Sequence, residues 1–182
     1  TRCDNLSCSF PFGFQECIYQ GVLFIQRLPT ECEIIVTIED LFFNKNVTTI
    51  KEGQAAVLES RINICLNSKS NSPDFLTLPT QIYCIGRDIE VDLTCTNNND
   101  YDSIVYSMEE IPANTGYPIS YKDNYAFSKP IYYWGFPDQY AIPRGFVLHS
   151  QSGKLSFCPM KIQTTVFMVE ASVYRGATRL GL

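Results

Sequence analysis

The sequence contains a single histidine, a single tryptophan and no cluster of basic residues. The histidine, His149, lies in a predicted turn at the end of a strand, and no catalytic motif pairs it with a serine or cysteine. The net charge is −5, and the lysines and arginines are scattered, so the basic footprint of a nucleic-acid-binding protein is missing. We therefore expect neither an enzyme nor a nucleic-acid-binding protein.

Long hydrophobic runs are also missing. The longest uninterrupted apolar stretches, such as residues 21–25, fall far short of the roughly 20 residues that cross a bilayer. The chain does not open with the charged and apolar regions of a signal peptide. We expect no membrane insertion, and we expect the chain to be a mature or excised segment.

The cysteines are dispersed singly along the chain, without a CxxC pair. Structural zinc needs close pairs of cysteine or histidine, so we expect no metal-bound cysteines. An even number of dispersed cysteines is typical of disulfides, which persist outside the cytosol and each add roughly 2–4 kcal/mol to stability. The candidates are Cys3, Cys8, Cys17, Cys32, Cys65, Cys84, Cys95 and Cys158. The pattern predicts an extracellular or cell-surface protein.

The pairing of these cysteines is open, because eight cysteines permit about 105 combinations. The pairs that we predict are Cys65 with Cys84, near a domain junction, and Cys95 with Cys158, within a second domain. The alternative is that one or more of the cysteines are buried thiols.

The pattern of side chains predicts β-strands throughout the chain. Residues 32–38 and 165–174 are rich in Val, Ile and Thr and alternate between apolar and polar side chains. In the second run the alternation breaks between Met168 and Ala171, which predicts a bulge or a strand that is buried on both faces. No window has the apolar spacing and caps of an amphipathic helix, so we expect little helix.

A polar run from Asn67 to Pro73 separates two strand-rich halves. It divides the chain into an N-terminal domain of residues 1–68 and a C-terminal domain of residues 69–182. Strands at a spacing of about 8–12 residues, with turn-forming residues between them, are typical of immunoglobulin-like β-sandwiches. The sequence therefore predicts an all-β protein with two such sandwiches in tandem.

Short motifs follow one another along the second half of the chain. They are Asn71-Ser72-Pro73-Asp74-Phe75, Asp100-Tyr101-Asp102-Ser103-Ile104-Val105-Tyr106, Tyr125-Ala126-Phe127-Ser128-Lys129-Pro130, Gln151-Ser152-Gly153-Lys154-Leu155 and Val169-Glu170-Ala171-Ser172-Val173-Tyr174-Arg175-Gly176. In this order they resemble the N-S-P-x-F, D-x-D-G-D-S-L-x-Y, Y-S-x-x-x-P, T-G-x-L and V-x-E-Y-R-x-G motifs of a known family. That family comprises the immunoglobulin-like repeat modules of large secreted surface proteins of Bacteroidota, of the gliding-motility-associated or adhesin type. The first half resembles the preceding module, for example in Leu28-Pro29-Thr30-Glu31-Cys32.

Modules of this family continue beyond the V-x-E-Y-R-x-G strand into one further strand, which completes the sandwich. Here the sequence ends with Arg179, Leu180, Gly181 and Leu182, so the resemblance implies that the second domain lacks its final strand. Thr1 and Arg2 look like the start of that strand. We expect copies to assemble head to tail, either in a tandem array or by strand addition between subunits. The alternative is that the chain ends in a disordered tail.

The D-x-D-G-D motif of the family is altered in this chain and retains two carboxylates, Asp100 and Asp102. Calcium prefers several carboxylate ligands, so we expect a turn rather than a calcium site, and we expect no other cofactor. Ser103 fits the D-[S/T]-aliphatic pattern of O-glycan acceptors in exported Bacteroidota proteins, and Asn5 and Asn46 begin N-x-[S/T] sequons. These three residues are the glycosylation candidates.

Residues 117–140 are rich in Tyr, Phe and Trp and are interrupted by prolines. We expect a long loop or a pair of edge strands there. Tyr132, Tyr133 and Trp134 are candidates for binding carbohydrate or a neighbouring surface, and the alternative is that most of these aromatic residues cover their own sheet.

Together, these patterns predict a non-enzymatic structural unit of an extracellular fibre or adhesin stalk, braced by disulfides and glycosylated. The expected partners are copies of the chain itself. A carbohydrate- or surface-binding module that uses residues 117–140 is the alternative function.

Overall fold

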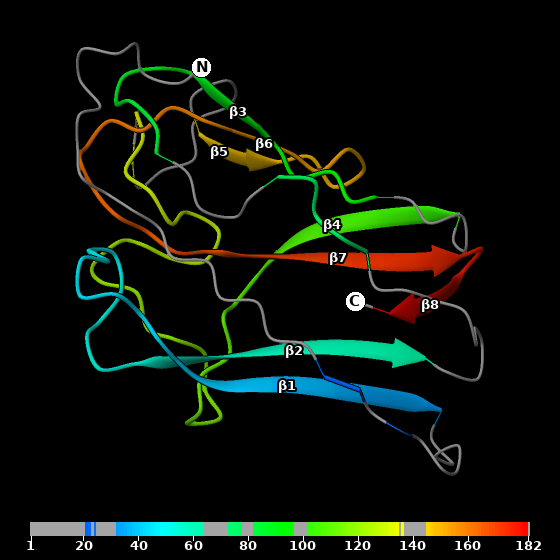
Figure 1. Ribbon diagram of the computed structural model, residues 1–182. Helices are drawn as coiled ribbons and strands as arrows, with labels where there is room; N and C mark the ends of the chain where they lie inside the picture. The colour runs from blue at the N-terminus through cyan, green and yellow to red at the C-terminus, as the bar shows by residue number, and fades with distance from the viewer. Residues whose placement is uncertain are drawn as a thin grey trace.

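The structure, a computed structural model, describes residues 21–22, 24, 32–63, 73–77, 82–96, 102–134, 136 and 145–181. This part of the chain forms eight β-strands and no helix, so the predicted all-β class is confirmed. The strands pair antiparallel and form two sheets (Figure 1). Within the same residues, no helix is long and apolar enough to cross a membrane.

The larger sheet has five strands in the order β1-β2-β8-β7-β4. They are β1 (Glu33–Phe42), β2 (Ala55–Asn63), β4 (Ser103–Glu109), β7 (Met168–Arg175) and β8 (Thr178–Gly181). The strands predicted at residues 32–38 and 165–174 correspond to β1 and β7, and both are confirmed. Ala171, Ser172 and Val173 are buried one after another, so β7 is buried on both faces. This burial explains its broken alternation.

The smaller sheet has three strands in the order β3-β6-β5. They are β3 (Ile89–Asp92), β5 (Phe146–Leu148) and β6 (Lys154–Phe157). Ile89 and Val91 are buried, whereas the alternate residues of β3 are exposed. Because successive side chains of a strand point to opposite faces, this alternation places one face of the small sheet in the core and the other in solvent.

The two sheets share apolar contacts. Met108 of β4 packs against the buried cluster of the small sheet, which also contains Ile131. Leu148 of β5 packs against this cluster and against a second one that contains Tyr106 and Ala171 of the large sheet. The arrangement is consistent with a β-sandwich.

Tyr106 lies at the corner where the two sheets meet. Its hydroxyl accepts a hydrogen bond from the backbone N–H of Cys95 (3.0 Å), and its own backbone N–H donates to the carbonyl of Ser150 (2.8 Å). A Cβ on Gly153 would lie 2.9 Å from Cζ of the Tyr106 ring, and Gly153 has a φ of 67°. Both the space and the backbone conformation therefore favour glycine at residue 153. The turn between β5 and β6 covers the outer edge of β4 at this point.

The large sheet crosses the predicted domain boundary at residue 68. β1 and β2 precede the boundary, β4, β7 and β8 follow it, and Ile62 of β2 pairs with Gly181 of β8. The contact is close, because a Cβ on Gly181 would lie 2.7 Å from the carbonyl oxygen of Arg61. A buried cluster also takes residues from both sides of the boundary, namely Ile50, Ala56, Ile111 and Ile119. The described residues of the two halves thus share one sheet and one buried cluster.

The expected gap beside residues 168–175 is filled. β8 follows β7 after the turn at Gly176 and pairs with it, with Tyr174 opposite Arg179. β2 pairs with the other side of β8, and Leu180 is buried against Val173. The expectation that the C-terminal half lacks the strand after β7 is therefore wrong. The short run of residues 178–181 forms that strand because it is held between two neighbours.

Candidate interaction surfaces

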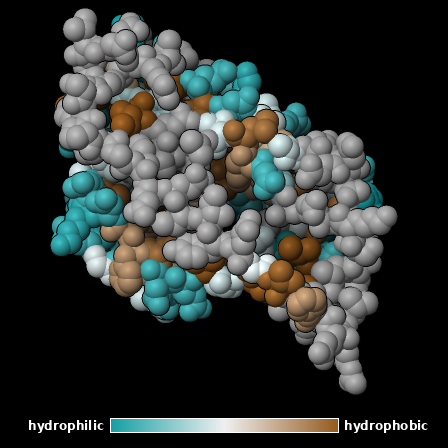
Figure 2. Space-filling view, viewed as in Figure 1, coloured by the Kyte–Doolittle hydropathy of each residue, from teal (hydrophilic) through white to brown (hydrophobic). Residues whose placement is uncertain are grey.

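The first candidate is strand β1, at the edge of the large sheet (Figure 1). Among the described residues, β1 pairs with β2 alone. Val36 and Ile38 are 50% and 54% exposed, and they share a face with Leu58, which lies opposite Ile38 and is also exposed. Figure 2 shows separate hydrophobic patches in the lower part of this view, with hydrophilic side chains between them. Natural edge strands are often short or carry Lys or Pro, whereas β1 has ten residues and neither.

One end of β1 is protected. The ladder with β2 shifts register between Ile38 and Leu41, and Asp40 has a φ of 58°. The Asp40 carboxylate also accepts a hydrogen bond from the side-chain amide of Asn114. Because a bulge bends and twists a strand, the part of β1 that is suited to pairing is residues 33–38.

The other face of the β1–β2 hairpin is charged. Arg61 lies between Glu59, at 3.0 Å, and Glu33, at 3.8 Å. These side chains are exposed, so the ion pairs contribute little to stability. The hairpin therefore has one apolar face and one charged face.

The second candidate is the aromatic segment. Tyr133 is 0% exposed, and its ring lies edge-on to Phe136 with 5.5 Å between the ring centroids. Tyr133 is therefore a core residue, and its interpretation as a binding residue is wrong. Tyr132 and Trp134 precede and follow it and are 39% and 59% exposed. In an extended chain successive side chains alternate in direction, which explains why the middle residue of the three points inward.

Gln163 holds Tyr132 in place. Its Oε1 accepts hydrogen bonds from the backbone N–H of Tyr132 (3.2 Å) and from the hydroxyl of Tyr125 (3.1 Å). The carbonyl of Tyr132 accepts a hydrogen bond from the backbone N–H of Met160 (2.9 Å). The described part of residues 117–140 forms isolated bridges and turns rather than strands, so the predicted loop is confirmed there.

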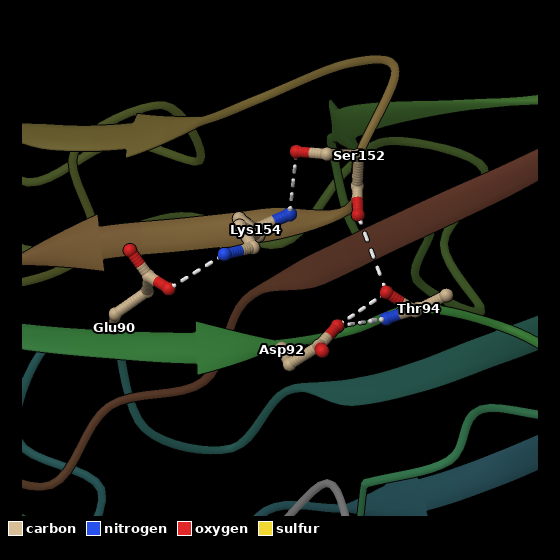
Figure 3. Close-up of polar contacts among 5 residues, drawn as sticks. All are labelled: Glu90, Asp92, Thr94, Ser152 and Lys154. Carbon is tan, nitrogen blue, oxygen red and sulfur yellow. Dashed lines mark hydrogen bonds and ion pairs between the residues drawn. The ribbon is translucent and has the colours of Figure 1, made fainter.

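A polar network lies on the exposed face of the small sheet (Figure 3). Lys154 donates to Glu90 (2.9 Å), and Asp92 accepts hydrogen bonds from the hydroxyl and the backbone N–H of Thr94. Ser152 accepts from the backbone N–H of Lys154 (3.4 Å). The bonds from Thr94 lower the pKa of Asp92, and Glu90 raises the pKa of Lys154. Both groups hold their charge at neutral pH, whereas a general acid or base needs a pKa near the working pH.

Asp102, the calcium candidate in the described part of the chain, serves a turn. Its Oδ2 accepts a hydrogen bond from the backbone N–H of Gly176 (2.7 Å), and its own N–H donates to the carbonyl of Tyr174 (2.8 Å). Asp100 lies outside the described residues. No three His, Cys, Asp or Glu side chains gather as a metal site within the described ranges.

Two glycosylation candidates are exposed. Ser103 begins the edge strand β4, and Asn46 lies in the turn that follows β1. The hydroxyl of Thr48, the third residue of the Asn46 sequon, donates to the carbonyl of Thr164 (3.2 Å). The third candidate, Asn5, lies outside the described residues. Glycosylation stays a prediction.

The cysteines of the described part fall into two classes. Cys32 and Cys84 are disulfide-bonded, whereas Cys95 and Cys158 are buried thiols. The predicted disulfide between Cys95 and Cys158 is therefore wrong, and the alternative of buried thiols holds for both. Cys95 follows β3 and Cys158 follows its antiparallel partner β6, so the two lie beyond opposite ends of one ladder. The strand rise separates them by about 20 Å, whereas a disulfide needs Cα atoms within about 7 Å. The remaining candidates lie outside the described residues: Cys3, Cys8, Cys17 and Cys65.

The expected assembly residues at the C-terminal end have structural contacts. Arg179 forms an ion pair with Glu170 at 2.6 Å. Leu180 is 3% exposed, so it is a core residue rather than an assembly residue. Thr1, Arg2 and Leu182 lie outside the described residues.

Sequence patterns do not single out the edge of β1. The lack of Lys and Pro in residues 33–42 is compatible with an exposed edge strand, but it is equally compatible with a central strand. Which strand lies at an edge depends on the pairing order of the whole sheet.

A comparison with protein-family models, with curated proteins and with solved structures finds no match. The resemblance to the Bacteroidota surface modules therefore rests on the sequence motifs.

Proposed function

We propose that the chain is a structural, non-enzymatic unit of an extracellular surface fibre or adhesin stalk, in which copies associate through a sheet edge. The observation that carries the proposal is β1, which pairs with β2 alone among the described residues and leaves Val36 and Ile38 half exposed. The unpaired edge of a sheet is a template for a strand of another chain.

Other features support this function. The disulfide bonds of Cys32 and Cys84 favour an extracellular location, because disulfides persist in oxidising compartments. The family resemblance favours an immunoglobulin-like sandwich, and the two antiparallel sheets are consistent with a β-sandwich. The sheet that β2 and β8 share favours two halves that fold together. Ser103 and Asn46 are exposed, as glycan acceptors must be.

Electron microscopy of the native material, followed by intact mass measurement, tests the proposal. We expect filaments, and a mass per unit above the 20.7 kDa of the polypeptide because of attached glycans. Dispersed particles at the bare polypeptide mass would contradict both the fibre and the glycosylation.

A second candidate function is carbohydrate binding by Tyr132 and Trp134. Both rings are exposed, and the buried Tyr133 between them anchors the segment to the core. A glycan array with the wild type, Tyr132→Ala and Trp134→Ala tests this function. Phe42→Ala is the matched control, because Phe42 is an exposed aromatic residue outside residues 117–140. Loss of signal in the first two variants alone supports carbohydrate binding, and an array without wild-type signal refutes it.

A further inference from the structure

The outer edge of β1, a strand that pairs with β2 alone among the described residues, points to a specific partner. We propose that β1 pairs antiparallel with β1 of a second copy, about a two-fold axis at Thr37. The inference rests on the proposed function in that it uses the same edge, and it adds the identity of the contact and its symmetry.

The opposite edge of the sheet is a poor partner for β1. At β4 the backbone N–H of Tyr106 already donates to the carbonyl of Ser150, in the turn that packs Gly153 against the Tyr106 ring. Each step from β1 to β4 in the sheet is antiparallel, so the two edge strands run in the same direction. A sheet continued by simple repetition would therefore pair β1 with β4 in parallel, which is less stable per residue. Two-fold pairing of β1 with itself is antiparallel.

The side chains of β1 favour a register with the axis at Thr37 over one with the axis at Val36. With the axis at Thr37, Val36 lies opposite Ile38 of the second copy, and Thr37 lies opposite its own counterpart. Pairs of β-branched side chains and of threonines stabilise antiparallel strands. With the axis at Val36, Glu33 would lie opposite Glu39, and like charges in that position are destabilising.

The Thr37 register also extends the apolar face of the hairpin. Within one copy, Leu58 lies opposite Ile38 and Ser60 lies opposite Val36. The pairing joins these rows end to end, so that Ile38 of each copy lies between its own Leu58 and Val36 of the other. Exposed apolar surface is thereby removed from water in both copies.

The contact is closed by its symmetry. A two-fold interface uses the same surface on both copies, so it ends at a pair and does not continue into a filament. With the axis at Thr37, the straight parts of the two strands face each other over residues 36–38, and the bulge at Asp40 limits how far the ladder continues on either side. The structural unit of a fibre would therefore be a two-fold pair, joined to other pairs through different surfaces.

Sedimentation velocity of the full chain across a dilution series tests the inference. We expect the wild type to reach twice 20.7 kDa and to dissociate on dilution. Val36→Lys places a charge in the middle of the contact and should stay monomeric where the wild type is paired. Ile162→Lys is the matched control, because Ile162 is an exposed apolar residue outside the hairpin, and it should pair like the wild type. A monomeric wild type, or pairing of Val36→Lys equal to that of the wild type, would overturn the inference.

Cross-linking tests the register without disrupting the fold. In antiparallel strands, directly opposite residues have Cα atoms about 4.5–5.5 Å apart, which is within disulfide range. Thr37→Cys should therefore form a disulfide with its own counterpart under mild oxidation, whereas Glu39→Cys should not. Equal cross-linking of both variants would contradict the Thr37 axis.

The outcomes for the two proposals are distinct. Pairs that form in solution while native material shows no filaments would support the inference and contradict the fibre. Filaments that assemble equally well from Val36→Lys would support a fibre whose contacts lie on other surfaces and contradict the pairing of β1.

Discussion

Replacing Gly153 with alanine tests the packing at the corner of the two sheets. Gly153 has a φ of 67°, in the left-handed region where a residue with a Cβ is less stable by about 1–2 kcal/mol. The new Cβ would also lie 2.9 Å from Cζ and 3.1 Å from both Cε atoms of Tyr106. Tyr106 is buried, and its hydroxyl accepts a hydrogen bond from the N–H of Cys95, so the ring cannot turn away without breaking that bond. Overpacking of this kind costs about 1–3 kcal/mol.

The two contributions are separated by a second glycine. Gly86 has a φ of 70°, close to that of Gly153, but a Cβ there would meet nothing within 4 Å. Gly86→Ala should therefore lose only the backbone part, and Gly153→Ala should lose about 1–3 kcal/mol more in the free energy of unfolding. Urea unfolding of the full chain with its disulfides intact measures both values, provided that the slopes agree. Equal losses in the two variants would refute the reasoning that the Tyr106 ring is held tightly.

Three further predictions concern buried polar groups. Burial raises the pKa of Tyr121 to about 12, above its ordinary value. Its contribution to the free energy of unfolding is therefore complete below about pH 10 and is lost as the pH rises through 12. Between unfolding measurements on either side of that range, the free energy of unfolding should fall less for Tyr121→Phe than for the wild type. The hydroxyl of Thr165 donates to a backbone carbonyl (2.7 Å) and accepts from the buried Thr49 (2.8 Å), so Thr165→Val should destabilise by about 1–3 kcal/mol in urea unfolding, and a neutral variant would contradict this network. Cys95 and Cys158 are buried thiols, and burial raises the pKa of Cys95, so both should resist alkylation until denaturant is added; a peptide that links the two by a disulfide would disprove this assignment.

The sequence alone determines the all-β class and the position of its clearest strands. Alternation between apolar and polar side chains is a local property, because each side chain points away from its neighbour on the same strand. Ile89 and Val91 face the core for this reason, and the run that becomes β1 is recognisable from its β-branched residues. An aromatic loop around Tyr132 and Trp134 is likewise evident from composition.

Only the tertiary structure decides which strands are neighbours and which side chains are buried. The polar run at residues 67–73 predicts a surface segment but does not reveal that β2 and β8 join one sheet across it, because pairing partners lie far apart in the sequence. Tyr133 and its two neighbours are alike in composition, and contact with the core determines which of them is inside. Cys95 and Cys158 are separated by the register of β3 and β6, and β1 is an edge because of the order of the whole sheet. These features depend on long-range contacts, which form only when segments that are far apart in the sequence pack together.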